Sequence, residues 1–427
     1  MTAEAKFEQV ERFVPDLEQC MKCGFCTGVC PVYAEEKVES SVARGKNMMI
    51  RGLLDGSLSY TKEYAERLNK CTLCMACTEN CPAKANIPNV IVAARADVVK
   101  ARGVKFPYNF LYRWILPHRR LFGNVVRVAS WLQRVFMPRT QGTIRHLPFF
   151  LSALGRGRQI PTVASKFLRQ RTSVVNKPPE GVETKFTVGY FTGCMTDYVF
   201  PDLGEHIIDF LTRNGVEVVV PKEQGCCGAP AFLGAGDFET GRRLADANVE
   251  AFKDVDYIIC DCATCTSAIK DYPKFLADTP EREKAYTEIS EKIKDITQFV
   301  IDILQPPASA YKASAEAKGK KVTWHDPCHL NRHLGIKSQP RELIRSIPDI
   351  EYIEMPNADR CCGMAGTFSI YYYELSKKIA DQKMESLKST GADIIATDCP
   401  GCQIQFIDNT IRHKLPVKVM HVMELIE

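Results

Sequence analysis

Cysteine is the residue type whose number and spacing indicate most about the chemistry of this chain. The 427 residues include 19 cysteines, and these fall into groups instead of being scattered. Eight of them form two runs of identical spacing, Cys-x2-Cys-x2-Cys-x3-Cys-Pro, at residues 20–31 and 71–82. Three thiolates at i, i+3 and i+6 can hold three corners of one [4Fe–4S] cubane, while the fourth cysteine of such a run binds the other cluster in two-cluster ferredoxins. The two runs therefore predict a pair of cubane clusters.

The exchange of the fourth cysteine between runs assigns the ligands of each predicted cluster. The first [4Fe–4S] cluster is expected to bind Cys20, Cys23, Cys26 and Cys81, and the second Cys71, Cys74, Cys77 and Cys30. Zinc is the main alternative, because it also binds four thiolates, but zinc sites normally use two separated Cys-x2-Cys pairs. The spacer of about 40 residues between the runs is long for a small bacterial ferredoxin. It suggests a helical ferredoxin domain that resembles the iron–sulfur subunits of respiratory dehydrogenases.

Ten further cysteines form two matching sets in the second half of the chain. Each set has one cysteine after a strand-like run, then Cys-Cys-Gly, then Cys-x2-Cys, and equivalent elements lie 134, 135 and 137 residues apart. The glycine permits the positive φ of a turn that lets neighbouring cysteines face one centre. Five thiolates are one more than a cubane uses, so spacing leaves the bound group open, with disulfides or buried thiols as alternatives. The sets are Cys194, Cys226, Cys227, Cys262 and Cys265, and Cys328, Cys361, Cys362, Cys399 and Cys402.

Two kinds of element are expected to position these cysteines. The first hundred residues have helical patterns at 64–70 and 89–100, the latter with Pro88 suited to the first turn. The second half alternates short β-branched runs with helical patterns, clearest at 237–253 and 372–388, which predicts α/β units with a largely parallel sheet. The fold class predicted is α+β and multidomain: an N-terminal α-helical dicluster ferredoxin domain, then a duplicated α/β module. The predicted domains are 1–100 (ferredoxin), 101–180 (basic, aromatic-rich helical connector), 185–315 (first module) and 320–427 (second module).

The cysteine pattern resembles a known family. Cys…Cys-Cys-Gly…Cys-x2-Cys, present twice, is similar to the cysteine-rich (CCG) domain of heterodisulfide reductase catalytic subunits and of glycolate oxidase, D-lactate dehydrogenase and anaerobic glycerol-3-phosphate dehydrogenase iron–sulfur subunits. Residues 23–27, 44–46 and 361–367 look like signature stretches of the glycolate oxidase family, which also joins a twin-cubane domain to two such modules. The resemblance covers nearly the whole chain. It implies one or two further, non-cubane [4Fe–4S] clusters held by the ten cysteines of the two modules.

Two features next to these sets stay outside the cysteine pattern. Cys260 has Thr397 as its counterpart in the second half, so it is interpreted as a small buried side chain and not a ligand. His325, His329 and His333 lie around Cys328, where structural histidines are the commoner case and proton donors the alternative.

Residues 98–179 carry a distinct charge. They include 16 Lys and Arg and no Asp or Glu, whereas the whole chain has a net charge of +5. Residues 121–137 place apolar side chains at helical spacing with Arg127 on another face, and Trp114 and Trp131 lie in the same zone. Such a basic amphipathic helix suits an anionic membrane surface, and the alternative is a connector packed on acidic neighbours or on a partner subunit. No nucleic-acid-binding motif accompanies the charge, so nucleic acid is not expected as a partner.

The absence of certain motifs completes the functional expectation. No Gly-x-Gly-x-x-Gly after a strand and no phosphate-binding Gly-x4-Gly-Lys-Ser/Thr occur, so no flavin is expected on this chain. Residues 1–19 lack the apolar core of a secretory signal, which favours a reducing compartment. The resemblance implies an electron-transferring subunit of an oxidoreductase complex. A flavoprotein oxidising glycolate or lactate would supply electrons, and quinone, a cytochrome or membrane-anchor subunit or another carrier would accept them.

The location expected is the cytoplasm, peripheral on the inner face of the cell membrane, with contact through residues 101–180. The alternative function is that of a heterodisulfide reductase-like catalytic subunit, which reduces a disulfide at non-cubane clusters. No catalytic residue is assigned in either case.

Overall fold

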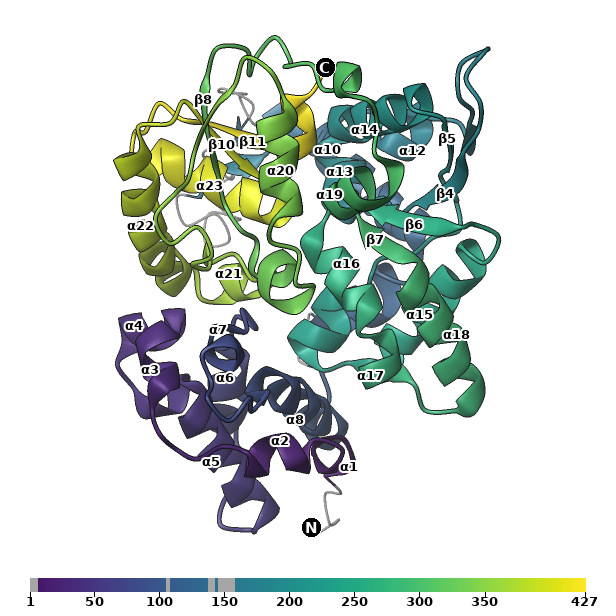
Figure 1. Cartoon of the computed structure of the whole chain (residues 1–427). Coiled ribbons are helices and arrows are strands. Elements are labelled where there is room, and N and C mark those ends of the chain that lie inside the picture. The colour runs from purple at the N-terminus through teal and green to yellow at the C-terminus, as the bar shows by residue number, and fades with distance from the viewer. Residues whose placement is uncertain (1–6, 105–107, 137–142, 145–157) are drawn as a thin grey trace.

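The chain folds into a helical N-terminal domain and two α/β modules that lie side by side above it (Figure 1). The computed structural model describes residues 7–104, 108–136, 143–144 and 158–427. This arrangement confirms the predicted fold class. Within the described ranges, no helix is both long enough and apolar enough to cross a bilayer.

The N-terminal domain is entirely helical in its described part, and its longest helix, α8, is buried along most of its length. Pro88 lies in the first turn of α8, as predicted, because the missing N–H of proline has no partner to lose there. The predicted helix at 64–70 is α6. The helices of the domain are α1 (Glu8–Glu11), α2 (Val14–Glu18), α3 (Phe25–Val29), α4 (Pro31–Glu36), α5 (Ala43–Leu54), α6 (Lys62–Asn69), α7 (Ala76–Glu79) and α8 (Ile87–Arg102).

The connector crosses from this domain to the modules and packs on the first of them. Its described elements are α9 (Tyr108–Phe110), a π-helical turn (Leu111–Ile115), α10 (Arg119–Phe136), β1 (Thr143–Ile144), β2 (Ile160–Pro161), α12 (Leu168–Arg171) and β3 (Val175–Asn176). Helix α10 covers the predicted amphipathic segment, except for residue 137, which lies outside the described residues.

The first module is a sheet of five strands in the order β3-β5-β4-β6-β7, parallel except for the edge strand β3. Its strands are β4 (Phe186–Tyr190), β5 (Val216–Val219), β6 (Tyr257–Cys260) and β7 (Ile293–Asp295). Its helices are α13 (Cys194–Tyr198), α14 (Pro201–Arg213), α15 (Phe238–Ala251), α16 (Ala263–Lys270), α17 (Tyr272–Leu276), α18 (Pro280–Lys292) and α19 (Ile296–Gln298). Parallel strands joined by helices are the expected result of alternating β-branched and amphipathic stretches.

The second module repeats this order with four parallel strands, β9-β8-β10-β11. They are β8 (Lys321–Trp324), β9 (Glu351–Ile353), β10 (Ile394–Thr397) and β11 (Lys418–His421). The helices are α20 (Gln339–Ser346), α21 (Phe368–Tyr371), α22 (Tyr373–Thr390) and α23 (Pro400–Arg412). The equivalence β4/β8, β5/β9, β6/β10 and β7/β11 confirms the duplication read from the cysteines.

Candidate iron–sulfur sites

The two cysteine runs of the N-terminal domain meet between helices α3, α5 and α7. One pocket is lined by Cys20, Cys23, Cys26 and Cys81, with Cys77 also on its wall. The fourth cysteine of the second run thus lies with the first three of the first run, as the expected exchange requires. Gly24, between two of these cysteines, has φ of +90° and begins α3 in a conformation that glycine adopts without strain.

The fourth cysteine of the first run, Cys30, lies near the cysteines of the second run. Cys30 ends α3, and the proximity of Cys71 adds to the effect of burial in raising the pKa of its thiol. Cys74 and Cys77 are also close enough to Cys30 for it to raise their pKa values. The structure therefore brings together the four cysteines that were predicted to hold the second cubane.

Buried positive charge accompanies this second set. The ammonium of Lys46 is buried in α5 and donates hydrogen bonds to the carbonyl oxygens of Ser40 and Ser41 at 3.1 and 2.6 Å. The guanidinium of Arg95 is buried in α8 and donates to the carbonyl oxygen of Cys71 at 2.9 Å. A cluster with four thiolate ligands is anionic, so two buried cations fit it and would be costly without it.

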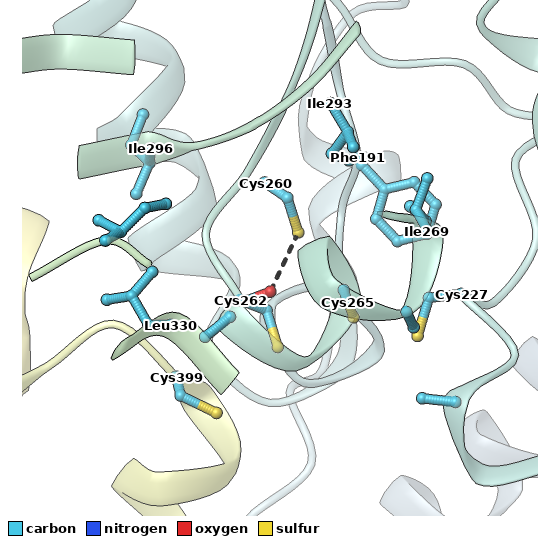
Figure 2. Packing of buried hydrophobic residues seen from close by; sticks show 14 of the residues in the cluster. Phe191, Cys227, Cys260, Cys262, Cys265, Ile269, Ile293, Ile296, Leu330 and Cys399 are labelled. Carbon is cyan, nitrogen blue, oxygen red and sulfur yellow. Dashed lines mark hydrogen bonds between the residues drawn. The ribbon is translucent and has the colours of Figure 1, made fainter. Parts of the chain in front are cut away.

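In the first module, all five cysteines lie at the carboxyl ends of strands, where parallel α/β sheets build their sites. Cys194 begins α13 shortly after β4, Cys262 caps α16 after β6, and Cys265 lies in the first turn of α16. Figure 2 shows Cys262 and Cys265 together with Cys227 from the Cys-Cys-Gly turn. Gly228 in that turn has φ of +78°, which confirms the need for glycine predicted from the sequence.

Side chains that the sequence did not single out hold the Cys-Cys-Gly turn in place. The amide of Asn248 accepts from the N–H of Gly225 at 2.8 Å and donates to the carbonyl of Cys226 at 3.0 Å. The hydroxyl of Tyr272 donates to the carbonyl of Cys227 at 3.0 Å. Both side chains come from helices, α15 and α17, in which nothing in the sequence distinguishes them from ordinary core residues.

The second module repeats the arrangement. Cys399 caps α23, Cys402 lies in its first turn, and the Sγ atoms of Cys362 and Cys402 are 3.3 Å apart. Gly363 has φ of +88°, again within the Cys-Cys-Gly turn. Cys328 and Cys361 complete the set, since each strongly affects the pKa of the other.

The cysteine sets also touch one another. Cys74 of the second run packs with Cys361 and Cys328 of the second module in one buried group. At the boundary between the modules, Cys262 and Cys399 are neighbours (Figure 2). The N–H of Ala263 donates to the carbonyl of Asp398 at 3.1 Å across the same boundary. The four sets therefore lie in one series: first run, second run, second module, first module.

The thiols fit a metal-bound state. All 19 cysteines lie in the described part of the chain, and all have free thiols, so the disulfide alternative is wrong for this structure. Burial raises the pKa of Cys194 to about 11, and burial together with Cys361 raises that of Cys74 to about 12. Such thiols stay protonated at neutral pH unless a cation replaces the proton, and metal binding does this. Soft thiolate sets of this size suit iron–sulfur clusters.

Buried carboxyls line the boundary between the modules. Asp261 and Asp398 directly precede Cys262 and Cys399 and are fully buried. Burial raises the pKa of both carboxyls, and the Asp398 carboxyl lies 2.9 Å from Nε2 of His421. Burial thus disfavours the charged form of both carboxyls next to the thiolates that follow them.

Cys260 lies beneath the first set, inside the sheet. Its side chain is fully buried and its Sγ donates to the carbonyl of Cys262 at 3.7 Å, as Figure 2 shows. Of the three histidines around Cys328, His329 has its Nδ1 2.6 Å from Oγ of Ser267, and His333 has its Nε2 3.1 Å from the Asp271 carboxylate. Both are structural in these contacts.

Several basic residues of the connector form ion pairs with carboxylates of the same chain. Arg119 and Arg169 both pair with the buried carboxylate of Asp197, at 2.7 and 3.1 Å, and Arg113 pairs with Asp237 at 3.2 Å. These contacts match the alternative of a connector packed on acidic neighbours.

Family comparisons agree with this geometry. A "4Fe-4S dicluster domain" model matches residues 16–85, and a "Cysteine-rich domain" model matches residues 188–270 and 322–407. The probable glycolate oxidase iron-sulfur subunit of Bacillus subtilis is 29% identical over 446 aligned positions, covering 100% of this chain and 98% of that protein. Lactate utilization protein A of Oceanobacillus iheyensis is 32% identical over 239 positions, covering 56% of this chain and 96% of that protein. The chain belongs to the family of glycolate oxidase iron–sulfur subunits and lactate utilization protein A.

The chain is also similar to part of a reductase. One of the fumarate reductase (CoM/CoB) subunits of Methanothermobacter marburgensis is 27% identical over 415 positions, covering 96% of this chain and 72% of that protein. The glycolate oxidase relative and this fumarate reductase relative are both subunits of redox enzymes by name. The chain is therefore an iron–sulfur protein with a redox role.

Proposed function

We propose that this chain is the electron-transfer subunit of a dehydrogenase complex. A flavoprotein subunit oxidises a 2-hydroxy acid, glycolate or lactate, and passes single electrons to this chain, which delivers them to quinone or another carrier. Two cubane clusters, in the sets of Cys20, Cys23, Cys26 and Cys81 and of Cys71, Cys74, Cys77 and Cys30, and a non-cubane [4Fe–4S] cluster in each module supply one-electron chemistry. No flavin is bound to this chain.

One observation carries the proposal: the four cysteine sets form a continuous series. Cys74 contacts Cys361 across the boundary with the second module, and Cys399 contacts Cys262 across the boundary between the modules. A series of closely spaced one-electron centres is what transport between two separate substrates needs, whereas a catalyst acting alone would need only one.

The first set is the end of the series that a partner can approach. Cys23 is exposed, and Met21 and Phe25 on the wall of the same pocket are 65% and 67% exposed. Exposed large apolar side chains beside a redox site are suited to a protein partner, since apolar contacts drive association. We therefore place the flavoprotein at this end.

The decisive experiment is anaerobic isolation of the native complex, with identification of its subunits and assay of iron and flavin. We expect a flavoprotein whose flavin is reduced by glycolate or lactate, and about 16 iron atoms on this chain if every set holds four. A count of about 8 would remove the module clusters from the proposal. Isolation with no flavoprotein subunit would overturn the dehydrogenase function.

A second candidate function is reduction of a disulfide substrate, as in heterodisulfide reductases. The contact between Cys262 and Cys399 favours it, because two adjacent centres at one boundary can each supply an electron to a two-electron substrate. Turnover of a disulfide by the isolated, iron-replete protein would select this function. Failure to reduce disulfides, together with reduction by the flavoprotein, would exclude it.

Peripheral contact with the inner face of the membrane through residues 101–180 is the remaining part of the proposal. Trp114, Leu121, Val125, Val128 and Trp131 are all exposed on the connector helices. Their apolar surface, with Arg127 exposed next to it, suits an anionic interface. Co-sedimentation with vesicles that contain anionic lipid, and its loss in Trp131→Glu, would support the contact; equal recovery of both proteins in the supernatant would refute it.

A further inference from the structure

The second module has a histidine at a position where the first module has a phenylalanine. His325 directly follows β8, and Phe191 directly follows β4. The N–H of His325 donates to the carbonyl of Ala396 at 3.0 Å, and the N–H of Phe191 donates to the carbonyl of Ile259 at 2.8 Å. The acceptors lie in the equivalent strands β10 and β6, so the two side chains occupy the same place in the repeat. They are 0% and 1% exposed.

The tautomer of His325 is set by its hydrogen bond. Its Nδ1 lies 3.1 Å from the carbonyl oxygen of Ala358, and a carbonyl only accepts, so Nδ1 carries the proton. A second proton, on Nε2, would place a charge without an acceptor in a completely buried site, close to the Lys383 ammonium, so the ring is neutral. Nε2 therefore has a lone pair, and it is buried without a hydrogen-bond partner among the described residues.

The His325 ring is next to two cysteines of the second set. An imidazole nitrogen of His325 and the Sγ atoms of Cys362 and Cys402 all lie within 4.8 Å of one another. A thiolate has no proton to donate, so once these cysteines bind metal the lone pair of Nε2 has no donor among them. An iron ion in the same set is the acceptor that such a lone pair fits, and histidine replaces cysteine at some iron–sulfur centres.

The surroundings of the ring are those of a ligating histidine. Such a residue usually donates its second N–H to a carbonyl or carboxylate, which fixes the orientation of the ring. Here the Ala358 carbonyl does this, and it is held in turn by the Lys383 ammonium at 2.7 Å. On the other side the ring contacts Phe406 with centroids 4.9 Å apart. Most buried polar groups are hydrogen-bonded, so the unpaired Nε2 calls for a partner that the described residues do not supply.

We propose that His325 is a ligand, through Nε2, of the metal centre in the second cysteine-rich module. The first module has Phe191 in this place and binds its centre through cysteine alone. The two modules, although duplicated, thus hold chemically different centres. The proposal rests on the proposed function only in requiring an iron–sulfur cluster in the second module.

The test is electron spin-echo spectroscopy of the full chain, anaerobically isolated and poised at a series of potentials from oxidised to fully reduced. Protein grown with [15N]histidine in an otherwise natural-abundance medium is compared with unlabelled protein. We expect a directly coordinated nitrogen that changes with the histidine label. A full complement of about 16 iron with no label-sensitive nitrogen at any potential overturns the proposal while leaving the proposed function intact. A count of about 8 iron removes the cluster itself and is the separate failure of the proposed function.

Variants then assign the nitrogen. His325→Asn keeps a side-chain N–H for the Ala358 carbonyl and has no atom at Nε2, so we expect the coordinated nitrogen to be lost with the fold retained. We also expect a chelator, bathophenanthroline disulfonate, to remove iron from the second module at least about tenfold faster. His329→Phe is the neighbouring control and should keep the nitrogen signal. Loss of the signal in His329→Phe, or its persistence in His325→Asn, would assign the ligand elsewhere and overturn the proposal.

Discussion

Single residues near each set of cysteines affect two separate properties: whether iron is bound there, and the reduction potential of the cluster. Cys260, which is not expected to bind metal, is buried like the expected ligand Cys265 and differs from it in where its side chain lies. Cys265 belongs to the first turn of α16, while Cys260 lies inside strand β6 with its Sγ directed to the carbonyl of Cys262. A buried cation such as Lys46 affects the reduction potential of a cluster, because it acts through space on the charge of that cluster.

The first residue-scale prediction separates the two kinds of cysteine. We expect Cys265→Ala to lose about four iron atoms per chain, because the first module then lacks a ligand. Cys260→Ala is the matched control and should retain all its iron, with destabilisation of no more than about 2 kcal/mol from the small cavity it leaves. Iron analysis and denaturant unfolding measure both. Equal iron loss in the two variants would make Cys260 a ligand and contradict the interpretation of the repeat.

The second concerns the charge of Lys46. Lys46→Met removes a buried cation beside Cys30 and Cys71, so the reduced, more negative cluster loses stabilisation and its reduction potential should fall. At an effective dielectric constant of about 20, one charge several ångströms away contributes roughly 2 kcal/mol, which corresponds to a drop on the order of 50–100 mV. A redox titration followed by electron paramagnetic resonance measures it. Lys62→Met, on the exposed side of α6, should leave every potential unchanged.

At the scale of elements, the repeat requires a tight turn at the same place in both modules. Gly228 and Gly363 both have positive φ, but their surroundings differ. A Cβ on Gly363 would lie 2.7 Å from the carbonyl oxygen of Ser376 in α22, whereas on Gly228 the nearest atom is Cδ1 of Phe232 at 3.3 Å. The turn at Gly363 is therefore bounded by backbone, which cannot move easily. The turn at Gly228 is bounded by a side chain, which can move.

This difference predicts unequal costs for the same substitution. Gly363→Ala should lower the free energy of unfolding by about 1–3 kcal/mol from backbone strain and by more from the clash, and should reduce iron in the second module. Gly228→Ala carries the strain without the backbone clash, so its cost should be the smaller. Thermal unfolding and iron content of the two variants make the comparison. A larger effect at Gly228 would contradict this account of the turns.

The elements were also where the sequence was most informative. The short β-branched runs expected before the cysteines are strands in both halves, β4, β5 and β6 and then β8, β9 and β10, because β-branched residues and the cysteine spacing mark them. Strand β7 was missed, since three residues directly after the charged helix α18 have no periodicity of their own. At the sites, the cysteines that the spacing grouped lie near one another in the structure. It could not find Asn248, Tyr272 or the free nitrogen of His325, since these depend on which helix faces which turn.

At the scale of the whole molecule, the N-terminal domain makes polar contacts with both modules. These contacts hold its cysteines in a fixed position relative to the cysteines of the modules. Arg332 of the second module reaches Glu79 of α7 at 2.7 Å and its own module's Asp359 at 2.6 Å. Arg95 of α8 donates to the carbonyl of Leu233 in the first module at 2.8 Å. Electron transfer between the domains therefore needs no domain movement.

The contact made by Arg332 gives the whole-molecule prediction. Arg332→Leu removes the ion-pair partner of Asp359 and leaves Glu79 with Lys337 alone, next to Cys74. We therefore expect the free energy of unfolding to fall by about 1–3 kcal/mol. Reduction of the second-module cluster, followed by rapid freezing after a reducing pulse, should slow several-fold. Lys337→Leu removes an exposed ion pair with the same Glu79 and should cost less than about 1 kcal/mol with no change in rate. Equal rates in wild type and Arg332→Leu would show that this junction is not on the route.

The order of the four cysteine sets also predicts the order in which their clusters are lost in air. The thiol of Cys23 at one end is exposed, while the cysteines of the two modules are buried, apart from the half-buried Cys194 and Cys328. In the proposed complex, molecular oxygen and chelators would reach the chain from the same side as the electron donor. We expect air exposure to bleach the first cubane before any other cluster, so that a partly aged preparation still holds most of its iron yet has lost its connection to the donor.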